Sequence, residues 1–200
     1  FSNLDPNTYT LSIVYPNCQF DTTFTLTAPP DPTVNAGPDQ TLCAGELPVN
    51  LNGGFGGSAT GITWSGGNGT FGMATDPNTT YTPTATEIAS GSVTLTINST
   101  GSPCPQVSDD VTITIVPDPD PGTNNSIVLC DNAPVTSLLG ELGGTPESGG
   151  SWNGPSTLWG GDSGDFNPAT MTPGTYVYSV TNGVCTYDAN VVVTVNMCSC

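Results

Sequence analysis

The sequence predicts an all-β protein that is built from tandem β-sandwich modules and cross-linked by disulfides. Three observations predict this class. Apolar residues occur in short runs that alternate with small polar residues, clusters of Pro, Gly, Asn and Asp separate these runs, and seven cysteines recur along the 200 residues. Alternation with a period of two is typical of strands that bury one face. The 19 Pro and 25 Gly supply the turns between the strands.

Six runs carry the strand pattern, and we expect a strand at each. They are residues 8–15, 20–27, 92–97, 111–116, 175–180 and 189–195. Val, Ile, Tyr, Phe and Thr dominate these runs, and such residues fit a pleated, half-buried surface. Helix is expected in two short places, one turn at residues 84–89 and a weaker candidate at 135–142.

An internal repeat organises the chain. Residues 167–180, followed by Cys185 and a strand, resemble residues 4–14, which are followed by Cys18 and a strand. The chain therefore opens on the last hairpin of a module. The expected parts, joined by extended Pro-rich linkers, are the terminal hairpin of an incomplete module at 1–29, β-sandwiches at 30–117 and 118–196, and a cysteine-containing tail at 197–200.

Each fuller module has a cysteine, a tryptophan 21 or 22 residues later, and a second cysteine near its last hairpin. The two sets are Cys43, Trp64, Cys104 and Cys130, Trp152, Cys185. Cysteines in an exported β-rich chain suggest disulfides. We expect Cys43 to pair with Cys104 and Cys130 with Cys185, each bond stabilising its module by about 3 to 4.5 kcal/mol. Bonds to other modules or other chains are left to Cys18, Cys198 and Cys200, and a metal or redox role is the alternative for the last two.

The chain has no Lys, Arg or His against 17 Asp and Glu, so its formal net charge at pH 7 is -17. Nucleic-acid binding is not expected, because Lys and Arg neutralise phosphates. A Ser or Cys nucleophile would lack its usual histidine base, and we expect no enzyme. No apolar stretch approaches the ~20 residues of a membrane span, so no membrane insertion is expected. The absence of an initiator methionine suggests a mature or internal piece of a longer exported polypeptide.

Four runs carry a resemblance to a known family: residues 35–46, 61–65, 81–91 and 104–105. They resemble the immunoglobulin-like and PKD-like repeats of large secreted surface proteins of Bacteroidota, most specifically over residues 34–117. The resemblance implies tandem immunoglobulin-like sandwiches, export by type IX secretion, a cell-surface location, and roles in adhesion, gliding motility or filament building. In antibody domains the tryptophan follows its cysteine more closely. We therefore expect a sandwich without the antibody topology.

Candidate sites are few, and each has a plainer interpretation beside it. Carboxylates near the module junctions could hold Ca²⁺, which takes six to eight oxygen ligands, although solvated acidic turns explain them more simply. These carboxylates are Asp31, Asp109, Asp110, Asp118 and Asp120. No other cofactor is expected. Asp162 and Asp165 form an acid pair of the kind that glycosidases use, but no cleft motif accompanies them.

Two further positions are candidates for carbohydrate chemistry. Trp159 follows Leu158 and precedes two glycines, a loop setting in which its ring could stack on a sugar; Trp64 and Trp152 are expected in the core. The run Asp21-Thr22-Thr23 resembles the O-glycosylation motif of Bacteroidota, which makes Thr22 the candidate acceptor.

Together these features favour a non-enzymatic, extracellular structural or adhesive segment of a bacterial surface fibre or adhesin. Its expected partners are neighbouring modules or copies of itself, and a polysaccharide or surface ligand. One alternative is a self-assembling filament subunit in which residues 1–29 complete a neighbour by strand addition. The other is a carbohydrate-binding accessory region of a secreted enzyme.

Overall fold

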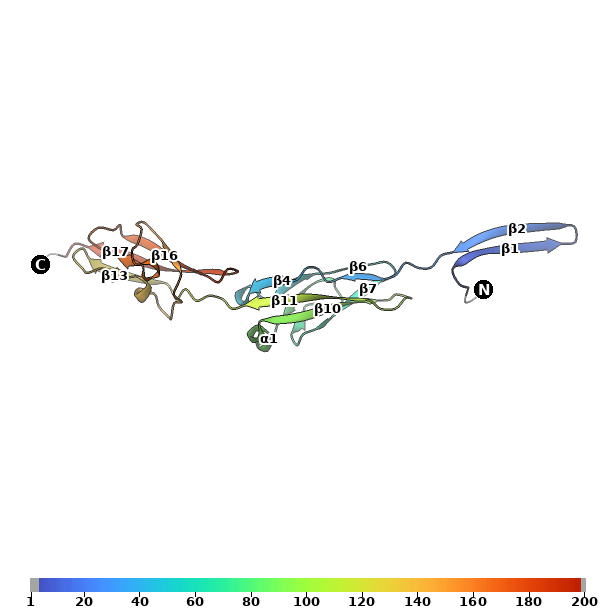
Figure 1. Cartoon of the computed structure of the whole chain (residues 1–200), viewed down its shortest axis with the longest axis horizontal. Helices are drawn as coiled ribbons and strands as arrows, with labels where there is room; N and C mark the ends of the chain where they lie inside the picture. The colour runs from blue at the N-terminus through green and yellow to red at the C-terminus, as the bar shows by residue number, and fades with distance from the viewer. Residues whose placement is uncertain (1–3, 199–200) are drawn as a thin grey trace. The chain divides into compact units, whose positions relative to one another are not determined.

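The computed structural model describes residues 4–198, and strands dominate them (Figure 1). All six expected strands are present, and the all-β prediction is confirmed. Contacts group the chain into two compact units. The first comprises residues up to 39 with 48–83 and 94–112, and the second comprises 40–47, 84–93 and everything from 113.

The chain begins with a two-stranded antiparallel hairpin, β1 (Asn7–Tyr15) and β2 (Cys18–Leu26). Its strands pair only with each other among the described residues. Nearly every residue of both strands is exposed. A lone two-stranded hairpin is marginally stable in water.

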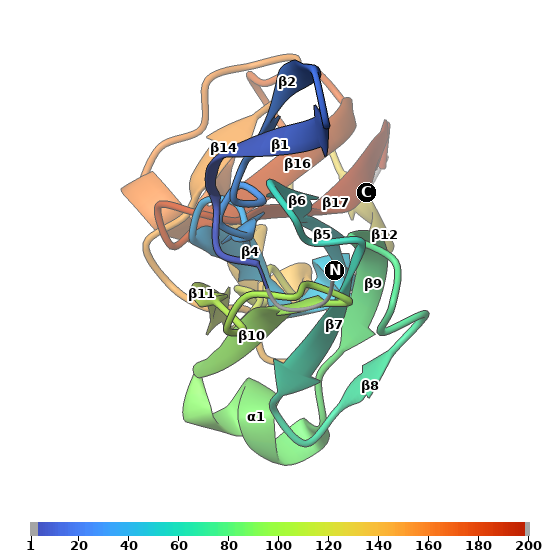
Figure 2. The same cartoon turned by 90° about the vertical axis from the view of Figure 1, so that its right-hand side faces the viewer.

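The first sandwich, residues 33–116, has a four-stranded sheet in the order β4-β11-β10-β7 and a three-stranded sheet in the order β5-β9-β8. Its strands are β3 (Thr33–Asn35), β4 (Gln40–Cys43), β5 (Val49–Asn52), β6 (Gly54–Gly56), β7 (Gly61–Gly66), β8 (Thr70–Phe71), β9 (Asn78–Thr82), β10 (Ser92–Thr100) and β11 (Ser108–Val116). β3 pairs with β6, whereas β4 runs parallel to β11. Figure 2 looks along the strands and shows the two sheets as separate layers.

We count β3 with β4 as the first strand and β5 with β6 as the second, so that β7, β8, β9, β10 and β11 are the third to the seventh. In an immunoglobulin fold the second, fifth and fourth strands form one sheet, and the third, sixth and seventh belong to the other. The orders β5-β9-β8 and β7-β10-β11 match this arrangement. The expectation that the antibody order is absent is therefore wrong. Cys43 ends the first strand rather than lying within the second, and this placement explains why Trp64 follows it so late.

Aromatic rings join the two layers of the first sandwich. Phe71 packs on Trp64 and on Tyr81, with ring centroids 6.5 and 4.9 Å away. Trp64 belongs to one sheet and the other two residues to the opposite sheet. Further buried apolar residues come from alternate positions of β5, β7, β10 and β11, as the period of two requires; they are Val49, Leu51, Ile62, Val93, Leu95, Ile97, Val111, Ile113 and Ile115.

One helical turn, α1 (Ala85–Ser90), precedes β10 and confirms the turn expected at residues 84–89. Thr84 caps it, since its side chain accepts a hydrogen bond from the Glu87 amide while the Glu87 carboxylate accepts one from the Thr84 amide. This reciprocal capping box satisfies amide groups that the first turn leaves unpaired. Gly91 ends the helix in the left-handed region, with φ of 78°.

The second sandwich, residues 123–196, has a four-stranded sheet in the order β12-β17-β16-β14 and a small pair, β13-β15. Its strands are β12 (Asn125–Cys130), β13 (Thr136–Ser137), β14 (Ser151–Asn153), β15 (Asp165–Phe166), β16 (Gly174–Thr181) and β17 (Thr186–Asn196). β12 runs parallel to β17, as β4 runs parallel to β11. The helix considered for residues 135–142 is absent; β13 and a 3-10 turn at Leu139–Glu141 lie there, because Leu138 and Leu142 are drawn into the core.

Side chains from both sheets fill the core of the second sandwich. Phe166 of β15 packs edge-on against Tyr176 of β16, with ring centroids 5.5 Å apart. The Tyr176 hydroxyl donates a 2.7 Å hydrogen bond to the Thr172 carbonyl, four residues upstream. Immunoglobulin-like domains have a tyrosine corner of this kind at the start of their sixth strand. The resulting fold class is an all-β chain of immunoglobulin-like sandwiches that carries disulfides.

Candidate functional site: a cysteine junction and an open apolar face

The structure pairs the cysteines differently from the prediction. Cys43 is bonded to Cys185, with Cα atoms 6.0 Å apart, and Cys130 is bonded to Cys198, with Cα atoms 5.4 Å apart. Both separations are usual for disulfides. The expected pairs Cys43–Cys104 and Cys130–Cys185 are wrong.

Strand direction is the reason. Because β4 is parallel to β11, Cys43 lies opposite Val116 at the end of β11. Cys104 precedes the start of β11, so the strand separates the two cysteines by roughly 30 Å at about 3.3 Å per residue. The second sandwich repeats this geometry. Cys130 lies opposite Asn196 at the end of β17, whereas Cys185 immediately precedes that strand.

Two cysteines of the described residues remain as thiols, Cys18 and Cys104. Cys18 is exposed at the start of β2, and Cys104 is partly buried in the loop between β10 and β11. Cys198, considered for bonds to other modules or chains, is bonded within this chain. Cys200, considered for the same role, lies outside the described residues.

A cluster of polar contacts surrounds the Cys43–Cys185 disulfide, all within the second compact unit. One oxygen of Asp118 accepts hydrogen bonds from the Gly45 amide at 3.0 Å and from the Tyr187 hydroxyl at 3.1 Å. The hydrogen bond to the carboxylate, together with its negative charge, raises the pKa of Tyr187 above the ordinary value, because both favour the protonated phenol. Sequence reasoning did not predict this cluster, although the position of Asp118 between two prolines in the linker was a signal that could have pointed to it.

Among the described residues, one group has the proximity that a metal site needs: Cys43, Asp118 and Cys185, whose ligand atoms lie within 4.8 Å of one another. Two of the three are the sulfurs of the disulfide. Thiolates bind metals and disulfide sulfurs do not compete with them, so this group is a covalent cross-link.

The five aspartates considered for Ca²⁺ do not come together in one place. Asp109 and Asp110 lie at the start of β11, and Asp118 and Asp120 follow its end. Several already accept hydrogen bonds from the backbone: Asp109 from Ala36 and Asp120 from Gly122, each at 2.8 Å. Their arrangement supports local turns and strand ends, and Ca²⁺ binding at Asp31 or the others stays a prediction.

The register of the β1–β2 hairpin separates an apolar face from a polar one. Across the apolar face, Tyr9 is paired with Phe24 and Ile13 with Phe20, while the polar face pairs Thr8 with Thr25. We call the first set the open face; it comprises Tyr9, Leu11, Ile13, Tyr15, Phe20, Phe24 and Leu26. Phe20 and Tyr15 are each 62% exposed and Phe24 is 46% exposed. Thr22, the candidate glycosylation position, is paired with Leu11 and so lies on this face.

The open face has a buried counterpart in the second sandwich. A single offset along the sequence aligns the two hairpins, so that Tyr9 corresponds to Tyr176, Phe24 to Val191 and Cys18 to Cys185. The Tyr9 hydroxyl donates to the carbonyl of Asp5, four residues upstream, as Tyr176 donates to Thr172. Tyr176 and Val191 are both fully buried. The hairpin therefore shares its register and its tyrosine hydrogen bond with β16 and β17, and its apolar face is not covered by other described residues.

Trp159, the candidate for sugar stacking, is 56% exposed in a loop of the second sandwich. Its backbone forms an isolated bridge with Asp165. The Asp165 carboxylate accepts a 2.8 Å hydrogen bond from Ser163, and that of Asp162 accepts one of 2.9 Å from the Gly149 amide. Both carboxylates of the acid pair thus accept hydrogen bonds that stabilise loops. Trp64, expected in the core, is buried, and Trp152 is partly buried against Tyr178.

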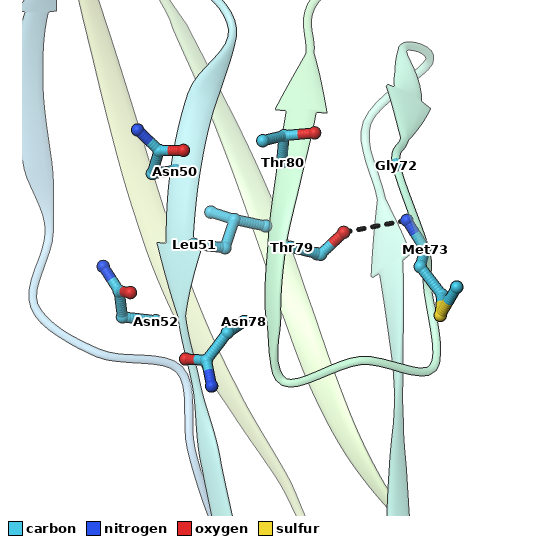
Figure 3. Close-up of a pocket in the computed structure, with 8 residues that line it drawn as sticks. All are labelled: Asn50, Leu51, Asn52, Gly72, Met73, Asn78, Thr79 and Thr80. Carbon is cyan, nitrogen blue, oxygen red and sulfur yellow. Dashed lines mark hydrogen bonds between the residues drawn. The ribbon is translucent and has the colours of Figure 1, made fainter.

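A shallow depression lies over β5 and β9 of the first sandwich (Figure 3). Asn50, Asn52 and Asn78 line it, and the Thr79 hydroxyl accepts a 2.8 Å hydrogen bond from the Met73 amide at its edge. None of its lining residues is ionisable, so the depression offers hydrogen-bonding groups without an acid or base.

Comparison with known proteins yields structural likenesses alone. No family model matches the chain, and no curated protein matches its sequence. The chain is similar to the insect immune protein hemolin (15% identity, TM-score 0.49, 94% of this chain and 56% of that one), to the I67–I69 fragment of titin (15%, 0.44, 96% and 75%) and to extracellular domains 3–5 of Drosophila OTK (12%, 0.48, 96% and 72%). It thus spans little more than half of the hemolin chain. No described helix is long and apolar enough to cross a membrane.

Proposed function

We propose that this chain is a non-enzymatic, load-bearing segment of an extracellular adhesin or surface fibre. The Cys43–Cys185 disulfide carries the proposal, because it joins the end of the first strand of one sandwich to the last hairpin of the next. Disulfides persist in oxidising, extracellular surroundings. When the chain is pulled, a covalent link between the sandwiches prevents the residues within the disulfide loop from extending.

The open face supports the same role. An apolar sheet face that is exposed to water is a binding surface for strands whose apolar residues can cover it. We commit to one occupant, the strands that precede the last hairpin of another immunoglobulin-like module, with the pattern of residues 118–170, which hold β12 to β15. A second copy of this chain is less suited, since its strands between residues 33 and 196 are already paired within sandwiches. Modules completed in this way would build a continuous string.

The resemblance to secreted repeats of Bacteroidota supports a finer assignment, in which type IX secretion exports the chain to the cell surface for adhesion or gliding. A surface ligand, including a polysaccharide, would then bind elsewhere on the string. Trp159 is the residue we assign to that contact, because its ring is more than half exposed.

Force spectroscopy on the oxidised chain, pulled from its two ends, tests the load-bearing role. The Cys43–Cys185 bond bypasses 142 residues, which correspond to roughly 500 Å of extended chain at 3.3–3.6 Å per residue. We expect this length to appear only after reduction. Cys185→Ser should release roughly half of this length without reductant, because the Cys130–Cys198 bond still bypasses 68 residues. Cys104→Ser, the matched control, should release none of it. Full extension of the oxidised wild-type chain would refute the proposal.

A further inference from the structure

The cysteines fall into two positional classes that the sandwiches share. The first class ends the first strand: Cys43 lies opposite the last residue of β11, and Cys130 opposite the last residue of β17. The second class lies in the loop before the last strand: Cys185 precedes β17, Cys104 precedes β11, and Cys18 begins β2. The first class therefore lies at the end of the module where the last strand finishes, and the second class lies at the end where the last strand begins.

The observed Cys43–Cys185 bond joins one member of each class, and it does so between consecutive modules. The first-strand cysteine comes from the earlier module and the hairpin-loop cysteine from the later one. Geometry explains the direction, since the first-strand cysteine lies where the last strand leaves its module and the linker to the next module begins. In the next module the hairpin loop holds Cys185, and the last strand, β17, begins directly after it. The loop therefore lies at the end of that module opposite to the end at which its last strand finishes.

We propose that Cys104 is the second link of the same ladder, forming a disulfide with the first-strand cysteine of the module whose last hairpin is β1–β2. This inference rests on the completion of the open face proposed above. Two observations support it: Cys104 is a thiol at the position where Cys185 is bonded, and the first sandwich follows the hairpin as the second sandwich follows the first.

The loop around Cys104 combines a fixed backbone with an adjoining groove. Its thiol is partly buried, and its amide is fixed by a 2.9 Å hydrogen bond to the Ser102 hydroxyl, which itself lies 2.8 Å from that of Ser58. A groove of about 410 Å³ adjoins it, lined by Ser99, Thr100, Gly101, Ser102, Cys104 and Gln106. A side chain from a preceding module could therefore reach the sulfur without unfolding the loop.

The chemistry is thiol–disulfide exchange with a small-molecule disulfide such as oxidised glutathione as the oxidant. One protein thiolate attacks a glutathione sulfur, forming a mixed disulfide and releasing one glutathione thiol. The second protein thiolate then attacks the protein sulfur of that mixed disulfide. The Sγ–Sγ bond forms, the second glutathione leaves as a thiol, and two protons and two electrons have passed to the oxidant.

A chimera tests the ladder. Residues 118–170 are placed directly before Leu4, so that a second copy of Cys130 and the missing strands precede the hairpin in the full chain. The chimera is refolded with oxidised and reduced glutathione, free thiols are alkylated, and peptides are mapped by mass spectrometry after peptic or chymotryptic digestion, since the chain has no tryptic site. Hydrogen exchange of β1 and β2 reports whether the open face is covered.

We expect the donated Cys130 to be linked to Cys104, with Cys104 losing its alkylation. Cys18 should stay alkylated, because no module precedes the new one, and it serves as the internal control. Cys104→Ser should leave the donated Cys130 as a thiol while β1 and β2 stay protected. Protected strands with Cys104 still alkylated would overturn the ladder and leave module completion standing. Unprotected strands would refute module completion itself.

Discussion

Tyr9 and Tyr176 occupy the same position in two hairpins, and each hydroxyl donates a hydrogen bond to the carbonyl four residues upstream, at 2.6 and 2.7 Å. Tyr176 is fully buried, whereas the face that carries Tyr9 is open. The same local structure therefore exists with and without its core. The hairpin β1–β2 thus has the register and the tyrosine hydrogen bond of β16–β17, without the packing that buries Tyr176.

Removing the tyrosine corner should destabilise the second sandwich. Tyr176→Phe deletes the hydrogen bond to Thr172 within the core, and we expect a loss of about 1 kcal/mol in the free energy of unfolding. Denaturant unfolding followed by tryptophan fluorescence measures it. Tyr15→Phe, at a 62% exposed residue, is the control and should change little. Equal stability of the two variants would mean that the corner has no energetic role.

Two neighbouring glycines separate backbone strain from steric clash. Gly164 and Gly161 both have positive φ, 61° and 67°, so alanine at either position costs about 1–3 kcal/mol in strain. A Cβ at Gly164 would lie within contact of the Trp152 indole ring, whereas one at Gly161 meets nothing within 4 Å. Gly164→Ala should therefore destabilise the second sandwich by a further ~1–3 kcal/mol. Thermal melts of both variants give the comparison, and a larger loss for Gly161→Ala would contradict it.

The capping box of α1 should stabilise the first sandwich. Thr84→Ala removes the acceptor of the Glu87 amide, and the usual cost of losing such a cap is about 1 kcal/mol. Thr86→Ala, an exposed change within the same helix, controls for the loss of a threonine and should be neutral. Chemical denaturation distinguishes them. A cap variant as stable as the control would show that tertiary contacts alone hold this turn.

The contact between Tyr187 and Asp118 should be sensitive to alkaline pH. The pKa of Tyr187 is raised in the folded chain, so its contribution to stability is present below the unfolded value of about 10 and is lost as the pH rises through the folded value. Melting temperatures from pH 8 to pH 11.5 should fall less steeply for Tyr187→Phe than for the wild type. Tyr15→Phe should follow the wild type, and identical slopes for all three would count against this contact.

The strand content and the capped turn were predictable from sequence because both depend on local rules. Alternation in residues 111–116 fixes which side chains enter the core, and Thr84 with Glu87 has the spacing of a capping box. Residues 135–142 were not predictable in the same way. Leu138, Leu139 and Leu142 have a helical spacing, but packing on Phe166 and Tyr176 overrides it.

The site was only partly predictable. The sequence repeat correctly placed Cys18 and Cys185 in one class and showed that the opening hairpin resembles the last hairpin of a module. It could not show that the first strand of each sandwich runs parallel to the last. That direction puts Cys43 and Cys104 at opposite ends of one strand, and no spacing along the chain reveals it.

By itself, the sequence determined the fold class, the positions of the main strands and the absence of cations and imidazoles, because composition and period-two patterning act within a few residues. Tertiary structure alone decided which cysteines bond, why Asp118 lies beside Tyr187, and which face of the opening hairpin is apolar and uncovered. Those features join residues far apart along the chain, as the 142-residue separation of Cys43 and Cys185 shows. Only the pairing and direction of strands bring such residues together.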